Sequence, residues 1–214
     1  MSTLTKLALG VMGKLRPKPP RGDTATTITL PPVEKHGGLP LMDALAQRRS
    51  GRDFAPDAIP LPVLSQMLWA AWGVNRSDGN RTAPTAIDCQ EIDLYVTLPE
   101  GAYLYDATTH ALQLTAAHDV RRVTGYQDFV DAAPLDLVYV ADHARMSLVP
   151  VGQRERYSCV AAGAIAQNVY LFAASAGLST VLRAWIDRNA IADALGLTHD
   201  QQVLLSQTVG FPKR

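Results

Sequence analysis

The sequence predicts a domain that mixes α-helices with β-strands. Residues 92–98 alternate apolar and polar side chains, as a strand does, and residues 135–141 form a strongly apolar strand. Residues 154–176 instead repeat apolar side chains at helical spacing. A chain of 214 residues is long enough for one large domain with a sizeable core. We therefore expect a single mixed domain over residues 39–214, preceded by an arm over residues 1–38.

The arm is set apart by its composition. It is basic and contains no acidic residue before Asp23. The proline-rich residues 17–20 break any helix there, and the residues that follow are expected to form an extended leader. The apolar run at residues 7–12 is too short to span a membrane, and no signal-peptide pattern is clear. Two interpretations stay open: a short amphipathic helix that touches a partner or lipid, and a mobile or partner-draped arm.

Local signals place the helices of the domain. Residues 39–47 carry apolar side chains at helical spacing, and a second helix opens at Pro62, where proline is tolerated, and closes at Gly73. The long helix over residues 154–176 is ended by the glycine that follows it. A shorter helix over residues 187–195 is ended in the same way.

The remaining segments predict strands and one loop. Two short strands, at residues 102–105 and 111–114, flank a turn and are expected to pair as a hairpin. Residues 178–185 and 201–209 are the last two expected strands. Residues 119–133 are expected to form a short helix and a loop.

Charge and cysteine content exclude several classes of function. The chain has 20 Lys plus Arg and 20 Asp plus Glu, so its formal net charge is zero. A neutral protein has no long-range field to gather nucleic acid or an anionic membrane, so we expect no nucleic-acid partner and no membrane span. The two cysteines, Cys89 and Cys159, make no disulfide framework, which favours a reducing compartment and a cytoplasmic location. Their spacing matches no zinc pattern and the five histidines are scattered, so no metal site is expected.

The densest basic cluster is the segment Arg48-Arg49-Ser50-Gly51-Arg52-Asp53-Phe54. Arginine forks bind pairs of phosphate oxygens, and a serine hydroxyl adds a further hydrogen bond. The segment can therefore hold a small dianion. The plainer interpretation is a solvated helix end, where cations offset the negative pole of the helix dipole.

Four further segments occur downstream in a characteristic order. They are Leu68-Trp69-Ala70-Ala71-Trp72-Gly73-Val74, Ala83-Pro84-Thr85-Ala86-Ile87-Asp88-Cys89-Gln90, Ala176-Gly177-Leu178-Ser179-Thr180 and Gly210-Phe211-Pro212. Together with the arginine segment they resemble the nitroreductase family of flavin enzymes. The sequence is most similar to the short SagB-type, azoline-oxidase-like dehydrogenase branch, to which the hairpin at residues 103–112 also fits.

The resemblance implies an α+β fold, in which helices flank a mainly antiparallel central sheet. It also implies an interlocked homodimer with FMN bound at the interface. The FMN phosphate is a dianion, which matches the arginine segment.

The resemblance further implies the residues of the cofactor site. Arg48, Arg49 and Ser50 would hold the FMN phosphate, and Arg52 would face the flavin edge that gathers negative charge on reduction. The remaining implied cofactor-binding residues are Pro84, Thr85, Ala86, Asp88 and Gln90 at the pyrimidine edge, Gly177, Leu178 and Ser179 near flavin N5, and Lys213 or Arg214 at the phosphate.

Asp88 departs from the family pattern, which usually has asparagine at this position. An ionised aspartate accepts hydrogen bonds and cannot donate them. Asp88 can therefore accept from the flavin N3–H group, but its charge disfavours an anionic reduced flavin. We expect a changed redox potential or weaker FMN binding. Ser179, where the family often has glycine, is a smaller departure.

The implied function is an FMN-dependent oxidoreductase. NAD(P)H would donate a hydride in a ping-pong reaction, and a nitroaromatic, quinone or similar conjugated acceptor would then take the electrons. One alternative is a flavin-dependent dehydrogenase or oxidase of a peptide or small substrate, in which Tyr157 would act as acid or base unless it only packs. Another is a non-catalytic subunit that binds flavin or lacks it.

Overall fold

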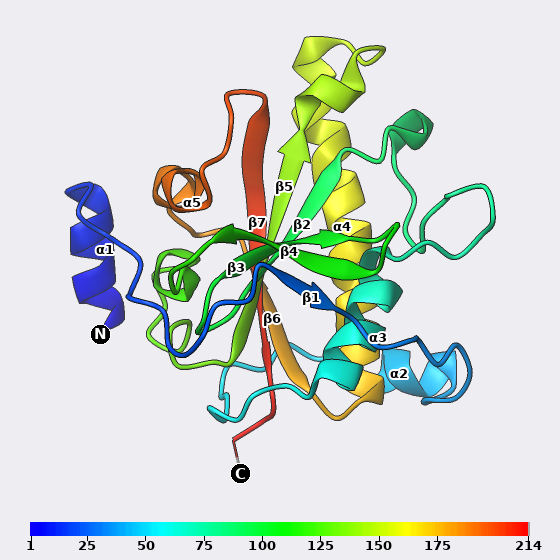
Figure 1. The fold of residues 1–214 in the computed structure, drawn as a ribbon, viewed down its shortest axis with the longest axis horizontal. Helices are drawn as coiled ribbons and strands as arrows, with labels where there is room; N and C mark the ends of the chain where they lie inside the picture. Colours follow the sequence, from blue (N-terminus) through cyan, green and yellow to red (C-terminus); the bar gives the residue numbers. More distant parts are fainter. Residues whose placement is uncertain (214) are drawn as a thin grey trace.

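The centre of the structure is a seven-stranded sheet with strand order β1-β4-β3-β2-β5-β7-β6, in a computed structural model that describes residues 1–213 (Figure 1). Every pair of neighbouring strands is antiparallel. The strands are β1 (Thr27–Thr29), β2 (Ile92–Thr97), β3 (Ala102–Asp106), β4 (Ala111–Ala116), β5 (Leu135–Asp142), β6 (Ser179–Arg183) and β7 (Gln201–Gly210). The expected α+β fold around an antiparallel sheet is confirmed.

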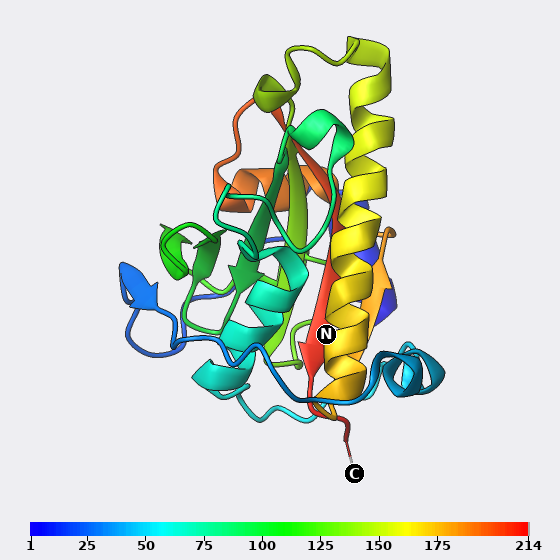
Figure 2. The ribbon, with the colours of Figure 1, turned by 90° about the vertical axis from the view of Figure 1, so that its right-hand side faces the viewer.

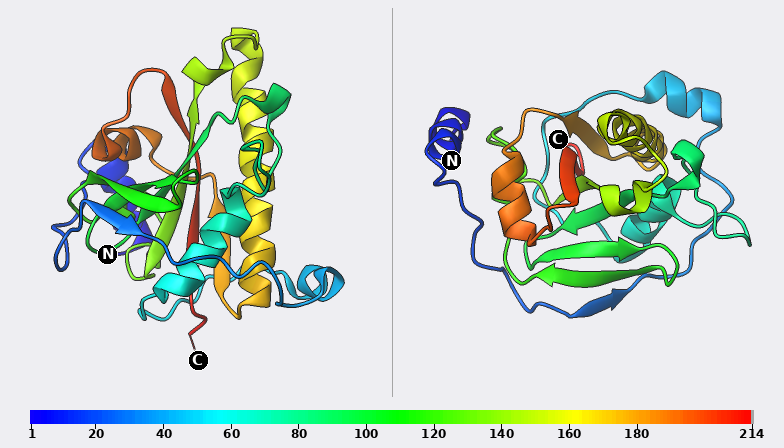
Figure 3. Two further views of the ribbon diagram at one scale, coloured as in Figure 1. Left: turned by 45° about the vertical axis from the view of Figure 1, so that its right-hand side comes forward. Right: turned by 90° about the horizontal axis from the view of Figure 1, so that it is seen from above.

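Helices cover both faces of the sheet. The α-helices are α1 (Thr3–Val11), α2 (Leu41–Gln47), α3 (Leu61–Trp72), α4 (Val151–Ser175) and α5 (Arg188–Leu195). Three short 3-10 helices are η1 (Ala86–Asp88), η2 (Arg121–Val123) and η3 (His143–Met146). Viewed from above, α3 and α4 lie on one side of the sheet and α1 and α5 on the other (Figure 3).

The central strands are buried on both faces, because each face meets a hydrophobic layer. In β5, Leu137 and Tyr139 join the cluster under α3 and α4, whereas Val138 and Val140 join the cluster under α5. The residues of β2 alternate between apolar and polar in the sequence, yet all of them are buried. Among them, Thr97 satisfies its hydroxyl by donating to the backbone oxygen of Asp136, at 3.0 Å.

Helix α4 is the longest element and runs the height of the sheet (Figure 2). Ala161, Ile165 and Val169 are buried against the core, and Gly177 ends the helix region with a left-handed φ of +68°. Within residues 1–213, α4 is the helix long and apolar enough to cross a membrane by length and composition. Its buried face shows that the same composition serves core packing in this fold.

Helix α2 differs from the sequence expectation in its orientation. Its apolar spacing suggested a face turned to the core, but Leu41 and Met42 are 63% and 73% exposed. Ala44 is the residue of this helix that is buried. The apolar side of α2 therefore lies on the surface of the single chain.

The first 38 residues are not extended throughout. Residues 3–11 form α1, and the following Leu15 is fully enclosed in the cluster beneath α5. The amine of Lys6 is completely buried and lies 2.8 Å from a carboxylate oxygen of Asp131, while the amine of Lys18 lies 2.6 Å from the other oxygen. Further along, β1 pairs with β4 at the sheet edge. The start of the chain thus packs on its own domain, and a domain boundary at residue 38 stays a prediction.

The carboxylate of Asp131, which contacts both Lys6 and Lys18, is the main polar contact that holds the first residues of the chain on the domain. Burial lowers the pKa of the Lys6 amine even though Asp131 opposes the shift. The two ammonium partners overcome the effect of burial on Asp131 and hold the pKa of its carboxyl well below the usual range. One carboxylate therefore forms ion pairs with two buried or half-buried cations, and its loss would leave both without this partner.

Asp131→Asn is expected to lower the free energy of unfolding by about 3 kcal/mol at pH 7, because it leaves Lys6 buried without its anion. Because folding depresses the pKa of Asp131, its contribution is present above about pH 4 and is lost as the pH falls below that. The difference between variant and wild type should shrink in that acid range. Denaturant titrations at several pH values measure it, with the exposed Asp128→Asn as control. Equal stability of Asp131→Asn and Asp128→Asn would contradict the assignment.

Candidate functional site

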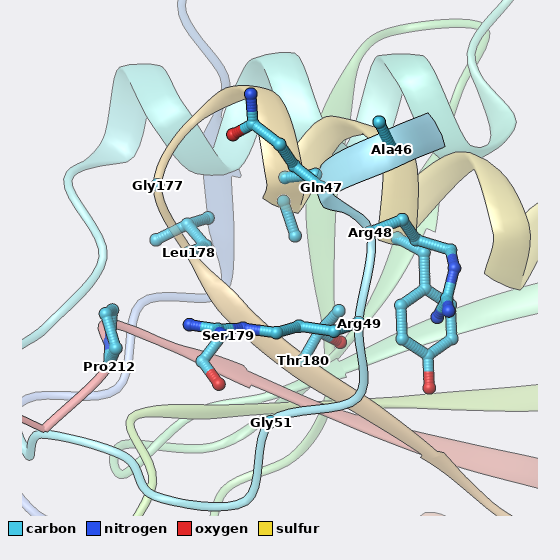
Figure 4. Close-up of a pocket in the computed structure, with 13 residues that line it drawn as sticks. Ala46, Gln47, Arg48, Arg49, Gly51, Gly177, Leu178, Ser179, Thr180 and Pro212 are labelled. Atoms are coloured by element: carbon cyan, nitrogen blue, oxygen red, sulfur yellow. The ribbon is translucent and has the colours of Figure 1, made fainter. Parts of the chain in front are cut away.

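A pocket of about 580 Å³ lies where the ends of α2 and α4 meet β6 (Figure 4). Its wall combines the arginine segment with the segment that follows α4. The lining residues are Ala46, Gln47, Arg48, Arg49, Gly51, Tyr170, Ala173, Ala174, Gly177, Leu178, Ser179, Thr180 and Pro212. Three of the motifs singled out in the sequence therefore converge at one place.

The arginine segment is bound directly to the sheet. The backbone N–H of Gly51 donates to the carbonyl of Thr180 at 3.0 Å. A Cβ on Gly51 would lie 1.9 Å from Oγ of Ser179, so the absence of a side chain permits this close approach. The carboxyl end of the chain is held alongside, since Ala55 N–H donates to the carbonyl of Phe211 at 2.9 Å.

The guanidinium groups of the segment lack counter-ions. Within residues 1–213, Arg48, Arg49 and Arg52 form no ion pair with a carboxylate. The side chain of Arg49 extends across the pocket toward Ser179 (Figure 4). Arg52 is exposed and does not line the pocket. Two of the three arginines therefore place uncompensated positive charge at the pocket.

Tyr170 of α4 supports this charge and was not identified from the sequence. Its ring lies 5.3 Å from Cζ of Arg48, within the range of a cation–π contact. Its hydroxyl lies 2.9 Å from Oγ of Ser50 and accepts the backbone N–H of Leu182 in β6, also at 2.9 Å. Tyr170 thus links α4, β6 and the arginine segment. Helical periodicity alone gave no signal that distinguished it from a core aromatic residue.

The turn after α4 forms the opposite wall. Gly177 takes the left-handed conformation that lets the chain reverse. Leu178 N–H donates back to the carbonyl of Ala173 at 2.8 Å, and Ser179 then starts β6 opposite Gly210. Residues 177–179 therefore line the same pocket as the arginine segment, and their contact with flavin stays a prediction.

The loop over residues 84–90 lies elsewhere in the same chain. None of its residues lines the pocket, and η1 lies beside the N-terminal half of α4, whereas α2 lies at its C-terminal end (Figures 1 and 2). Ile87, Asp88 and Gln90 have left-handed φ values of 45°, 54° and 48°. Such values are costly for side-chain-bearing residues, most of all for β-branched Ile87, and they cluster at functional segments.

Internal hydrogen bonds hold this strained loop. Gln90 N–H donates to Oγ1 of Thr85 at 3.0 Å, and Gln90 Nε2 donates to Asp88 at 3.3 Å. Arg81 Nε donates to Oε1 of Gln90 at 2.9 Å. The polar groups of Gln90 thus organise the loop itself, while Pro84, Ile87 and Asp88 remain exposed.

The other predicted site residues have separate positions. Lys213 N–H donates to the carbonyl of Asp53 at 3.2 Å, which keeps Lys213 beside the arginine segment although it does not line the pocket. Arg214 lies outside the described residues. Tyr157 lies roughly 20 Å from Tyr170 along α4, at a rise of about 1.5 Å per residue. Its hydroxyl donates to Gln153, and its acid–base role stays a prediction.

The chemistry available at the pocket is anion binding. The unpaired guanidinium groups of Arg48 and Arg49 suit a phosphate group. Ser50 does not line the pocket itself, but its hydroxyl lies next to it, at the hydroxyl of the lining residue Tyr170. Within residues 1–213, no cluster of three or more His, Cys, Asp or Glu side chains could hold a metal ion.

Comparison with known proteins identifies the chain. The model of the nitroreductase family matches residues 45–211. The chain belongs to the nitroreductase family. This membership places it among the flavin-dependent oxidoreductases. Assignment to the SagB-type branch of the family stays a prediction.

Two relatives match most of the chain. A protein of Methanocaldococcus jannaschii provisionally named as a nitroreductase is 34% identical over 170 residues, which cover 75% of this chain and 84% of that protein. A crystal structure of a protein provisionally named as a nitroreductase from Ralstonia eutropha JMP134 is 49% identical. It superposes with a TM-score of 0.90 and covers 94% of this chain and 96% of that one.

A more distant structure shows the same fold. The NADPH:FMN oxidoreductase of Vibrio harveyi, in complex with NAD+, is 19% identical and has a TM-score of 0.60. The match covers 81% of this nitroreductase-family chain and 69% of that one. At this identity the likeness concerns the fold.

Proposed function

We propose that the protein is an FMN-dependent oxidoreductase that uses NAD(P)H to reduce a nitroaromatic, a quinone or a similar conjugated acceptor. The observation that carries the proposal is the pocket that the unpaired Arg48 and Arg49 line together with the turn at residues 177–179. Family membership and the likeness in fold to the NADPH:FMN oxidoreductase of Vibrio harveyi support the choice of cofactor.

The residues of the pocket fit FMN. A volume of about 580 Å³ falls in the range of small-molecule sites, roughly 300–1,000 Å³. The two guanidinium groups lack carboxylate partners, so a phosphate dianion would neutralise charge that the described chain leaves uncompensated. Gly51 and Gly177 line the pocket without side chains, which lets a ligand approach the backbone at these two positions.

FMN, when bound, supplies the redox chemistry by taking a hydride from NAD(P)H and passing two electrons to the acceptor. The role of the protein is to bind FMN and to orient it. Arg48, Arg49 and Ser50 would hold the phosphate, and the backbone at Gly177 and Leu178 would border the ring. Such a reaction depends on positioning more than on a dedicated acid or base.

The hydroxyl network at Ser50 suits phosphate binding. Tyr170 already accepts the N–H of Leu182, so its own proton is free to go to Oγ of Ser50. Ser50 can then direct its hydroxyl proton at a phosphate oxygen. Tyr170 would therefore set the direction of the Ser50 hydrogen bond as well as the place of Arg48.

A second copy of the chain would complete the site. The loop at residues 84–90 does not reach the pocket of its own chain, and its Ile87 is 66% exposed. The apolar side of α2 and Val160 of α4 are also exposed, as expected of surfaces that pair with a second copy. In this homodimer Asp88 of one copy would accept a hydrogen bond from the flavin bound to the other.

An anaerobic absorption spectrum tests the function. The purified protein should be yellow or turn yellow with FMN, NAD(P)H should bleach it, and a quinone or nitroaromatic should restore the colour. A yellow protein that NAD(P)H leaves unchanged would favour the oxidase or binding alternative. A protein that ignores added FMN would favour a flavin-free subunit and contradict the proposal.

Tyr170→Phe is expected to weaken FMN binding about tenfold, because it removes the hydroxyl that orients Ser50. Riboflavin has no phosphate, so its binding should not change. Tyr103→Phe is the matched control, since the buried hydroxyl of Tyr103 has no hydrogen-bond partner. Fluorescence titrations with both flavins give the affinities. Equal losses for FMN and riboflavin would show that Tyr170 acts on the fold rather than on the phosphate.

Asp88→Asn is expected to strengthen FMN binding and raise the flavin reduction potential, because a neutral amide replaces a carboxylate beside the reduced ring. Asp88 forms no ion pair within residues 1–213 and contacts only Gln90 through its side-chain hydrogen bonds, so the change should leave folding intact. Flavin titration and reductive potentiometry measure the two effects, with Asp128→Asn as control. An unchanged affinity and potential would remove Asp88 from the site.

A further inference from the structure

A second pocket, of about 420 Å³, lies behind the loop at residues 84–90. It shares no lining residue with the first pocket. Its wall is formed by the end of α3, the loop itself, η3 and the strands β2, β3 and β4. The residues that matter for its chemistry are Trp72, Arg81, Gln90, Tyr105, Asp106 and Arg145.

Arg81 is the distinctive group of this pocket. Its Nη1 donates to the carbonyl of Trp72 at 3.2 Å, and its Cζ lies 5.1 Å from the centre of the Trp72 ring. The residue is half-buried, and this burial lowers the pKa of its guanidinium. Within residues 1–213 it forms no ion pair and its Nη2 donates to no protein atom. A desolvated cation with a free donor edge is a binding site for an anion.

The other cation of the pocket is already neutralised. Arg145 donates from Nη2 to Asp93 at 2.7 Å and lies 3.1 Å, through Nε, from Asp142. Its Nη1 donates to the carbonyl of Gln90 at 3.0 Å. All three nitrogens of its guanidinium are thus occupied, which leaves Arg81 to receive a ligand.

The remaining groups limit the charge and shape of that ligand. Asp106 accepts hydrogen bonds from Thr108, Thr109 and Gln113. All three donors are neutral, so none of them cancels the negative charge of Asp106 at the pocket wall. A dianion such as phosphate would be repelled by it. Trp72 and Tyr105 belong to the hydrophobic cluster on the same side of the sheet and line the pocket beside Arg81, and aromatic rings there suit a flat organic body. The wall therefore favours one negative charge on an apolar frame.

We propose that this pocket binds a small monocarboxylate with a flat apolar body, whose carboxylate pairs with Arg81. Arg81 would contact both Gln90 and the ligand, because Arg81 Nε already donates to the side-chain oxygen of Gln90. Occupancy is therefore transmitted to the strained loop through Gln90. This inference concerns a site distinct from the proposed FMN pocket and holds whether or not FMN binds there.

Benzoate is a suitable probe, titrated into the full-length protein and followed by amide NMR spectra and calorimetry. Saturable binding is expected, with shifts at the Trp72 indole and the Gln90 side-chain amide. Arg81→Gln should weaken it about ten- to hundredfold. Arg76→Gln, on the same loop and exposed, should leave it unchanged. Equal effects of both variants, or no binding by the wild type, would overturn the proposal.

Two further experiments test whether benzoate binds in the first pocket instead and whether a variant weakens binding only because it unfolds. Benzoate binding should persist with excess FMN, whereas displacement by FMN would show that the two ligands share a site and contradict the proposal. Gln113→Glu keeps Arg81 and adds negative charge to an exposed wall position, so it should also weaken benzoate binding. Inorganic phosphate should produce no shift at Gln90, and a benzoate-like response to it would overturn the assigned ligand class.

Discussion

The placement of two unpaired guanidinium groups against β6 is the constraint on which the site depends. Like charges repel, so Arg48 and Arg49 need a scaffold that holds them in place without an internal counter-ion. The hydrogen bond from Gly51 to Thr180 and the contacts of Tyr170 provide it. The charge that the chain leaves uncompensated is what makes the pocket selective for an anion.

The same chain holds its two cofactor-related segments apart. The arginine segment lies at the C-terminal end of α4, and the loop at residues 84–90 lies beside its N-terminal half. The loop is strained, internally hydrogen-bonded and exposed through Ile87, so it is built to present itself outward. The proposed site shared by two copies would explain this separation, and it would give the exposed apolar side of α2 a partner.

Much of the fold was predictable because its signals are local. The helices α3, α4 and α5 and the strands β2 to β7 follow from periodicity and from glycine at helix ends. The packing of α1 could not be predicted from local signals, because the burial of Lys6 depends on Asp131, which is far away in the sequence. The exposed face of α2 was missed for the same reason, because periodicity identifies an apolar face but not what covers it.

The site was predictable only in part. Motif order pointed to residues 48–50 and 177–179, and the structure brings these together. It could not reveal Tyr170, whose role depends on a hydrogen bond to Ser50 across the fold. Motif order could not reveal the second pocket either, since Arg81 is distinguished by its half-buried position beside the Trp72 ring and not by its sequence context.

A crystal structure of the protein grown with FMN tests the central claim most directly. The phosphate should lie between the guanidinium groups of Arg48 and Arg49 and within hydrogen-bond distance of Ser50. The loop carrying Asp88 should approach the same flavin from a second copy of the chain. Guanidinium groups that point into solvent, with FMN bound elsewhere or absent, would contradict the claim.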